Sequence, residues 1–327
     1  MGVKAAIYRR PGPPAEVFDV TDIEVPEPEP GQVRVRISTS GINPTDWKTR
    51  AGFAGRTPDW FQVPHHDGAG VVDAVGAGVG TLRKGQRVWL YLAAFHNRYG
   101  TAAEFAVVPA ERAVPLPDGA SDDLGACLGI PALTAAHALG GDPGQLAGRT
   151  VLVAGGAGAV GHFAIELAKH AGAQVVATVS NDEKAALAGK AGADFVVRYT
   201  EPDVARRILD FAGPVDRIVE VALAANLDLD VAVLGAPGTI AVYATEGELT
   251  LPVGEFMKAN TTLEFVLLYG VPPERLAAAV GWTSDALAHG ALSPLPVHPY
   301  NLDDVVQAHE TAEQAPTGKV ILRVGAH

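Results

Sequence analysis

Residues 151–173 of the sequence read VLVAGGAGAVGHFAIELAKHAGA. A short run rich in β-branched residues comes first, a glycine-rich turn follows, and a segment with apolar residues at helical spacing leads to a closing glycine. Gly156, Gly158 and Gly161 have the G-x-G-x-x-G spacing, and the stretch also fits G-x-x-G-x-x-G from Gly155. A strand, a glycine turn and a helix in this order predict a dinucleotide-binding unit.

The glycine turn is expected to hold the pyrophosphate of the dinucleotide. Glycines allow a tight turn and a close approach to phosphate, and the last glycine lets the helix pack against the strand. The free N–H groups at the start of the helix favour negative charge. A turn that serves packing alone is the alternative. We expect cofactor binding by Gly155, Gly156, Ala157, Gly158, Ala159, Val160 and Gly161.

The residues after the next predicted strand indicate which dinucleotide binds. That strand ends at Ser180, where sites that prefer NAD usually have an acid that holds the ribose 2′-hydroxyl. Ser180 and Asn181 are neutral and form hydrogen bonds, and Lys184 follows within one helical turn. This combination suits a 2′-phosphate and favours NADPH over NADH. Asp182 and Glu183 count against it unless they point to the solvent.

The pattern of the whole chain predicts an α/β protein of two domains. Residues 1–120 are β-rich, with short alternating runs separated by glycine and proline. Later, strands alternate with helices, which is typical of a parallel sheet with right-handed crossovers. The final run KVILRV is expected to rejoin the first domain. The predicted division is therefore 1–124 with 270–327, and 125–269.

Composition excludes several classes of partner. The chain of 327 residues has 25 Lys and Arg against 37 Asp and Glu, a net charge of −12. Such a protein repels nucleic-acid backbones and anionic membranes, and no stretch approaches the roughly 20 apolar residues of a membrane-spanning helix. Cys127 is the single cysteine, so no intrachain disulfide forms. Residues 1–12 lack the apolar core of a signal peptide. We expect a cytoplasmic protein.

Several stretches in fixed order carry a resemblance that covers the whole chain: SGINPTDWKTRAG, HHDGAGVVDAVGAGV, KGQRV, YGTAAEFAVVPA, PALTAAHAL, VLVAGGAGAVG and GADFVVRY. The chain resembles the medium-chain dehydrogenase/reductase superfamily, in its zinc-free NADPH:quinone oxidoreductase and zeta-crystallin branch. The resemblance implies a GroES-like β-rich catalytic domain, completed by the C-terminal segment, and a doubly wound Rossmann domain that binds NADPH. It also implies a homodimer that pairs through the strand in residues 262–269, TLEFVLLY.

The resemblance assigns further cofactor residues. Ser180, Lys184 and Tyr199 match the positions that hold the 2′-phosphate and the adenosine, although packing at a strand end would also explain Tyr199. Thr134 matches a threonine near the cofactor phosphates.

The resemblance also bears on metal binding. The first zinc ligand of zinc-dependent relatives, a cysteine, is matched by Asn43, and the third by Ile130. A histidine remains at the second position in His65-His66-Asp67. Neutral asparagine and isoleucine cannot replace thiolates, so we expect no metal.

The predicted reaction is hydride transfer from NADPH to a quinone or an α,β-unsaturated carbonyl compound. Without zinc, hydrogen-bond donors must stabilise the charge that develops on the carbonyl oxygen. The candidates are Asn43, which matches a residue near the nicotinamide, and His66, which would make this step pH-sensitive. Water or Tyr91 would supply the proton. Asp46 either takes part directly or caps local backbone amides.

Two other functions remain open at this point. One is an enoyl reductase that acts on a specific biosynthetic intermediate, such as a polyketide or a thioester. The other is a sensor that binds NADPH without turnover, because the same fold supports many functions.

Overall fold

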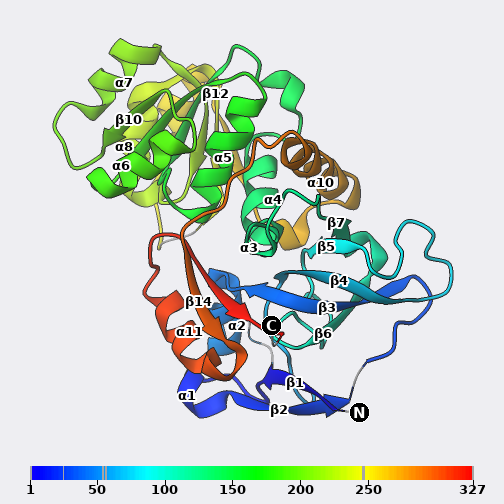
Figure 1. Cartoon of the computed structure of the whole chain (residues 1–327). Helices are drawn as coiled ribbons and strands as arrows, with labels where there is room; N and C mark the ends of the chain where they lie inside the picture. Colours follow the sequence, from blue (N-terminus) through cyan, green and yellow to red (C-terminus); the bar gives the residue numbers. More distant parts are fainter. Residues whose placement is uncertain (1, 25, 54, 56, 245–246, 326–327) are drawn as a thin grey trace. The chain divides into compact units, whose positions relative to one another are not determined.

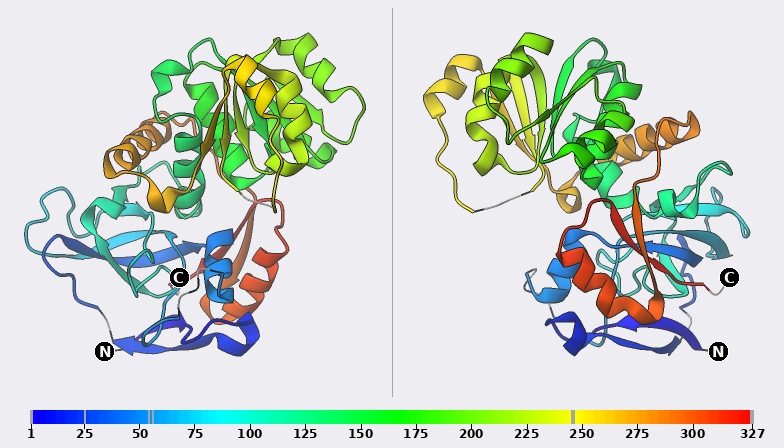
Figure 2. Two further views of the ribbon diagram at one scale, coloured as in Figure 1. Left: turned by 180° about the vertical axis from the view of Figure 1, so that it is seen from behind. Right: turned by 60° about the vertical axis from the view of Figure 1, so that its left-hand side comes forward.

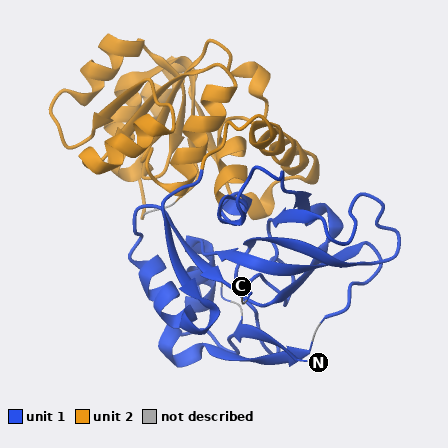
Figure 3. Ribbon diagram, viewed as in Figure 1, with its two compact units in different colours: residues 1–130, 294–327 blue, residues 131–293 orange. Residues whose placement is uncertain are grey.

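The computed structural model describes residues 2–24, 26–53, 55, 57–244 and 247–325. The chain divides into two compact units, and Figure 3 colours them separately. Unit 1 comprises residues 1–130 and 294–327, and unit 2 comprises residues 131–293. We expected the second boundary near 270. Helix α10 (Pro273–Ala288) belongs to unit 2 because it contacts α5 (Ala159–His170) there.

Unit 2 is built on a parallel sheet with the strand order β10-β9-β8-β11-β12-β13. The chain leaves the middle of this sheet in both directions, as the prediction of a doubly wound sheet requires. Every residue of β8 is buried, because helices cover both faces of the sheet. The strands are β8 (Thr150–Ala154), β9 (Gln174–Val179), β10 (Phe195–Arg198), β11 (Val215–Glu220), β12 (Leu234–Val242) and β13 (Thr262–Phe265).

The helices of unit 2 lie on both faces of that sheet, as both views of Figure 2 show. Helices α5 and α6 contact each other, and α7 and α8 contact each other. Right-handed crossovers place the two pairs on opposite faces. The Asn181 side chain caps α6. The remaining bounds are α4 (Gly129–Ala138), α6 (Asp182–Lys190), α7 (Val204–Ala212), α8 (Leu223–Val233) and α9 (Val253–Ala259).

Unit 1 is β-rich, with a sheet of strand order β14-β15-β3-β4-β5-β7 in which β6 also pairs with β3. The last strand, β15 (Lys319–Arg323), runs antiparallel to β3 (Gln32–Gly41), which confirms that KVILRV rejoins the first domain. Strands β1 (Gly2–Ile7) and β2 (Asp19–Glu24) form a separate pair. The other strands are β4 (Asp67–Val75), β5 (Arg87–Leu90), β6 (Phe105–Pro109), β7 (Ala113–Pro115) and β14 (Val297–Asn301).

Short helices complete unit 1, and α11 contacts α1, α2, β14 and β15 (Figure 1). Their bounds are α1 (Pro14–Val17), α2 (Pro44–Ala51), α3 (Asp122–Gly125) and α11 (Val305–Glu313). Within the described residues, no helix combines the length and the apolar character that a membrane span needs.

A pair of buried carboxyl groups lies inside unit 2. Glu220 ends β11, and its Oε1 accepts hydrogen bonds from the backbone N–H of Ala222 and, at 2.9 Å, from Nδ2 of Asn226. Burial, and then the negative charge of Glu220, raises the pKa of Asp230 on α8 to about 9. Asp230 is therefore protonated at neutral pH. The folded state retains a proton that the unfolded chain, with an Asp pKa of about 3.9, releases.

The D230N substitution is expected to stabilise the protein in alkaline solution. Because the folded pKa is raised, the wild-type stability contributed by this proton decreases from about pH 4 to pH 9, by about 1.4 kcal/mol per pH unit at most. Asn needs no proton, so this slope disappears. Denaturant unfolding at several pH values measures it, with exposed Asp228 on the same helix as the D228N control. Equal pH slopes for D230N and the wild type would contradict this account.

Candidate functional site

The glycine turn after β8 has a geometry that side chains would disrupt. Gly155 has a φ of 67°, in the left-handed region that favours glycine. A Cβ on Gly156 would lie 2.8 Å from Cβ of Ala177, and one on Gly161 would lie 2.3 Å from the carbonyl oxygen of Gly155. Gly158 is the N-cap of α5. The turn thus brings the start of a helix close to the carboxyl end of a parallel strand, where phosphate groups bind in such folds.

The next two strands bring two predicted residues together. Val179 pairs with Arg198 in the parallel register of β9 and β10. The backbone N–H of Tyr199 donates to the Val179 carbonyl oxygen at 3.0 Å, and Ser180 follows Val179 directly. Because β8, β9 and β10 are parallel, both residues lie at the same edge of the sheet as the glycine turn. Half of the surface of Tyr199 is exposed, which leaves its ring accessible to a ligand.

The charged residues at this edge are arranged less simply than the sequence indicated. Asn181 Oδ1 accepts the backbone N–H of Lys184 at 2.9 Å, so this side chain caps α6. Asp182 Oδ1 lies 2.7 Å from Nη1 of Arg198. Arg198 thereby offsets part of the negative charge of Asp182, and it also pairs with Glu201 three residues further on. Its contact with Asp182 spans 16 residues, so no local pattern in the sequence indicates it.

Two further features of unit 2 bear on cofactor binding. Thr134 lies on α4 and is buried, with 7% of its surface exposed. An apolar hollow of about 170 Å³ adjoins the carboxyl ends of β11 and β12. It lies at the same edge of the sheet as the glycine turn, and the sequence pattern did not reveal it. Leu223, Val242, Leu249, Leu251 and Phe265 line it, among others.

The G161A substitution is expected to weaken NADPH binding roughly tenfold or more, about 1.4 kcal/mol. The added methyl group would collide with the Gly155 carbonyl oxygen, which belongs to the rigid backbone of the turn. G189A is the matched control, since a Cβ at Gly189 on α6 meets no atom within 4 Å. Titration of NADPH against each variant provides the measurement. Unchanged affinity of G161A would mean that the turn does not hold the cofactor.

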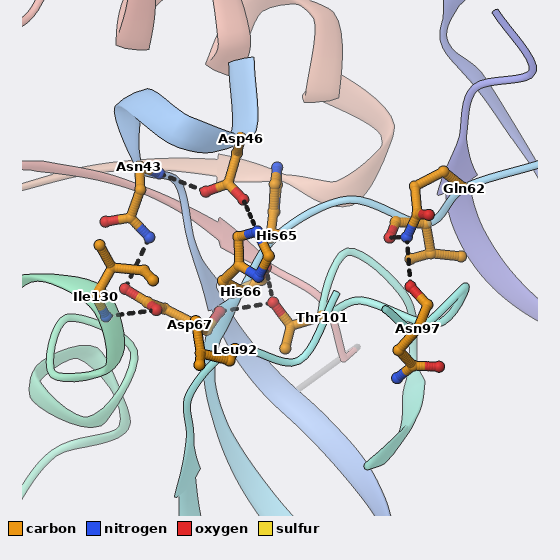
Figure 4. A network of polar contacts seen from close by, with 12 residues as sticks. Asn43, Asp46, Gln62, His65, His66, Asp67, Leu92, Asn97, Thr101 and Ile130 are labelled. Carbon is orange, nitrogen blue, oxygen red and sulfur yellow. Dashed lines mark hydrogen bonds and ion pairs between the residues drawn. The ribbon is translucent and has the colours of Figure 1, made fainter. Parts of the chain in front are cut away.

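A second polar cluster lies in unit 1, and Figure 4 shows it from close by. Asn43 precedes α2, and its backbone N–H donates to Oδ2 of Asp46 at 2.6 Å. Pro44 begins the helix, where its missing N–H costs nothing. Of the two interpretations of Asp46, local capping is therefore present in the structure.

Asp67 is the centre of this cluster. It is fully buried, and its Oδ2 accepts hydrogen bonds from Asn43 Nδ2 at 2.8 Å and from Lys319 Nζ at 3.3 Å. Its Oδ1 accepts the backbone N–H of Ile130 at 2.8 Å. Lys319 Nζ also donates to Asn43 Oδ1. Lys319 was not among the predicted site residues, and the available signal was a lysine directly before the apolar run Val320–Leu322.

The titration behaviour of the cluster follows from burial. Burial, reinforced by the negative charge of Asp67, raises the pKa of Asp46 to about 8. Burial, with a smaller effect of Arg112, lowers the pKa of His66 to about 3. His66 Nε2 lies 3.9 Å from Asp46 Oδ1. His66 is thus neutral near pH 7, and Asp46 is the member of this pair whose charge changes near neutral pH.

Two other polar residues near this cluster make structural contacts. His65 Nδ1 lies 2.8 Å from Ser40 Oγ, and its Nε2 lies 2.9 Å from Nε2 of His309, in a buried network. The Tyr91 hydroxyl donates to the Glu111 carbonyl oxygen at 2.9 Å, and burial raises the pKa of Tyr91 to about 12. Tyr91 therefore holds its proton firmly at neutral pH.

The donors around Asp67 do not match a zinc site. Asn43 offers an amide where a thiolate would stand, and the Ile130 side chain is apolar. Burial raises the pKa of Cys127 to about 12, so this buried cysteine is a thiol. The ammonium group of Lys319 already supplies the positive charge beside Asp67. A metal at Asp67 would have to displace that buried cation.

The K319M substitution is expected to destabilise the protein by about 3–5 kcal/mol, because it leaves the Asp67 carboxylate buried without its cation. The double variant K319M/D67N should recover part of this loss, since both charges are then absent. K84M is the control: Lys84 is 79% exposed and its ion pair with Asp73 contributes at most about 1 kcal/mol. Denaturant unfolding measures all three. A double variant no more stable than K319M would contradict the pairing.

Two family models match the chain. Residues 29–118 match the alcohol dehydrogenase GroES-like domain, and residues 159–285 match the zinc-binding dehydrogenase domain. The order and extent of these matches agree with the β-rich unit and the parallel-sheet unit. Together with the glycine turn they define a two-domain oxidoreductase that uses a nicotinamide cofactor.

The comparisons with individual proteins narrow the class. The chain is 31% identical over 306 residues to a quinone oxidoreductase of Rattus norvegicus, covering 92% of both chains. It is 28% identical, with a TM-score of 0.82, to a mycobacterial protein solved in complex with NADPH, covering 98% of this chain and 99% of that one. A cobalt- and zinc-bound alcohol dehydrogenase from Pyrobaculum aerophilum is also 28% identical, with a TM-score of 0.82 and coverage of 99% and 100%. The chain belongs to the medium-chain dehydrogenase/reductase superfamily, in its quinone oxidoreductase branch.

Proposed function

We propose that the protein is a zinc-independent reductase that transfers a hydride from NADPH to a quinone or an α,β-unsaturated carbonyl compound. The observation that carries this proposal is the buried contact of Lys319 with Asp67 and Asn43. It puts a fixed positive charge among residues that match the zinc-ligand positions of metal-dependent relatives. The quinone oxidoreductase relatives support the class of small-molecule substrate.

The edge of the sheet in unit 2 supports NADPH as the hydride source. The glycine turn would hold the pyrophosphate, and Ser180, Lys184 and Tyr199 would hold the 2′-phosphate and the adenosine. Position 180 is a serine, whereas sites that prefer NAD usually have an acid there that binds the ribose 2′-hydroxyl. The bound cofactor supplies the hydride from its nicotinamide ring, and the protein supplies orientation and electrostatics.

The side chains of the polar cluster have separate tasks in this proposal. Asn43 carries two amide hydrogens, of which Asp67 accepts one, and the other stabilises the developing oxyanion. Neutral His66 donates to the same oxygen. Asp46 holds a proton up to about pH 8 and supplies it, through the adjacent His66, to the reduced product. Tyr91 has no part in this route, because its proton is donated to Glu111.

We also propose that the protein is a cytoplasmic homodimer. Strand β13 is at one end of the sheet order, and it exposes Phe265 and, just beyond, Leu267 at 70% and 67% of their surfaces. An apolar strand at a sheet edge invites pairing with a second copy. Val253 and Met257 on α9 extend the exposed apolar surface. The cytoplasmic location agrees with a single buried cysteine in the thiol form.

The proposed function is tested by NADPH oxidation with a panel of quinones and enones in the presence of EDTA. We expect turnover that survives EDTA and a preference for one acceptor class. Turnover that needs added zinc would overturn zinc independence. NADPH binding without turnover on any acceptor would instead favour a sensor, and turnover on a thioester or polyketide enone alone would favour a biosynthetic enoyl reductase.

The cofactor preference has its own matched variant. The S180D substitution places an acid at the end of β9, which repels a 2′-phosphate and binds a 2′-hydroxyl. We expect the ratio of kcat/KM for NADPH over NADH to fall by roughly tenfold or more, about 1.4 kcal/mol. D228N, which alters an exposed residue of α8, is the control. A ratio that S180D leaves unchanged would refute the assignment of Ser180.

The pH profile tests the role of Asp46. Because its raised pKa keeps the proton up to about pH 8, kcat should decline as the pH rises through this value. The D46N variant lacks the titrating proton, so its kcat should be lower and should not decline there. A decline near pH 8 that persists in D46N would assign the titration to another group.

A further inference from the structure

A cluster of potential metal ligands lies in unit 2, at the C-terminal ends of two neighbouring helices. His170 is the last residue of α5, and Asp285 and His289 lie at the end of α10. The two helices contact each other and lie side by side in Figure 1. One ligand atom from each of the three residues lies within 4.8 Å of the other two.

The spacing agrees with the coordination sphere of a small divalent cation. His170 Nε2 lies 3.1 Å from Asp285 Oδ2, and His289 Nδ1 lies 3.4 Å from Asp285 Oδ1. In a tetrahedral zinc site with bonds of about 2.0–2.1 Å, neighbouring ligand atoms lie roughly 3.3 Å apart. Each imidazole nitrogen therefore already lies at about this separation from one oxygen of the Asp285 carboxylate.

The chemistry and electrostatics of the place favour a metal ion over another ligand. Two imidazoles and one carboxylate suit Zn²⁺, Co²⁺, Ni²⁺ and Cu²⁺ more than Mg²⁺ or Ca²⁺. Both helices direct their negative ends here, which favours a cation. In the described part of the chain, the ion pairs of Asp285 are those with His170 and His289, so no lysine or arginine competes for the carboxylate.

The three side chains are accessible and one of them is already oriented. The exposed fractions are 25% for His170, 58% for Asp285 and 64% for His289, so an ion from solution can enter and keep water as a further ligand. His289 Nδ1 donates to the backbone carbonyl oxygen of Asp285 at 2.8 Å. A metal bound at Nδ1 replaces this hydrogen bond, and the ring then keeps its proton on Nε2.

We propose that His170, Asp285 and His289 form a binding site for a divalent transition-metal ion of the zinc class, separate from the reaction site. The twelve residues of α5 span about 18 Å, so His170 lies at the far end of this helix from the glycine turn. The ion ties the end of α5 to the end of α10. Binding therefore stabilises unit 2 without entering the hydride transfer.

Equilibrium dialysis against Zn²⁺, followed by metal analysis, tests the site. We expect one zinc ion per chain in the wild type, and an affinity at least tenfold lower in H170N/H289N. H96N, which alters an exposed histidine elsewhere, is the matched control and should bind as the wild type does. Zn²⁺ should also raise Tm in the wild type and in H96N but not in the double variant. Equal binding by the double variant, or no binding by the wild type up to submillimolar Zn²⁺, overturns the proposal.

A second measurement separates this site from the polar cluster of unit 1. Co²⁺ bound to imidazole and carboxylate gives visible absorption bands, which should appear in the wild type and in H66N and disappear in H170N/H289N. Loss of the bands in H66N, with retention in H170N/H289N, would place the metal near Asp67 and refute the proposal. NADPH turnover of H170N/H289N should equal that of the wild type, because the site lies apart from the reaction site. Zinc found in the purified protein would therefore not show that catalysis needs zinc, and the EDTA assay tests that question separately.

Discussion

The buried ion pair between Lys319 and Asp67 is the interaction on which unit 1 depends. It joins the last strand, β15, to the first residue of β4, and Asn43 links the pair to the start of α2. The hydrogen bond from Ile130 ties the same carboxylate to α4. Removing two charges from water is costly, and the cost is offset only when every partner is in place. The contacts of the cluster are therefore expected to form together or not at all, and the positions of Asp46 and His66 depend on them.

The candidate sites of the two units differ in their electrostatic surroundings, although both belong to one acidic chain. In unit 2, the edge of the sheet that carries the glycine turn presents backbone N–H groups at the start of α5, and Arg198 pairs with Asp182 there. Unit 1 keeps Asp46 uncharged near neutral pH by burial and by the proximity of Asp67. The local contacts determine the charge surroundings of each site. The net charge of the whole chain, −12, determines neither of them. Charge balance over the whole surface is informative about partners such as nucleic acids, whereas a site is determined by its own shell of contacts.

Features that depend on neighbours in the chain could be predicted from the sequence. The parallel Rossmann sheet and the return of the last strand to the first domain are of this kind, and the structure confirms them. The family could be predicted because several of its sequence motifs occur in this chain in the same order as in the family. The contacts that no local pattern encodes could not be predicted. Lys319 meets Asp67 from 252 positions away, α10 joins unit 2 through its contact with α5, and the neutral state of His66 results from burial that only tertiary packing creates. The capping contact of Asp46 with the backbone of Asn43 also depends on the geometry of α2.

The split of unit 1 between the two ends of the described chain imposes an order on biosynthesis. Unit 2 is contiguous, so it can fold as soon as residues 131–293 have been made. Asp67 and β3, in contrast, wait for a strand that is translated 252 residues after Asp67, which takes about 13–50 s at 5–20 residues per second. During this interval the β3 edge that β15 will cover is open, and the Asp67 carboxylate has no cation beside it. A nascent chain in this state presents an unpaired strand edge, so the first half of the protein is the part that a ribosome-associated chaperone would have to shield.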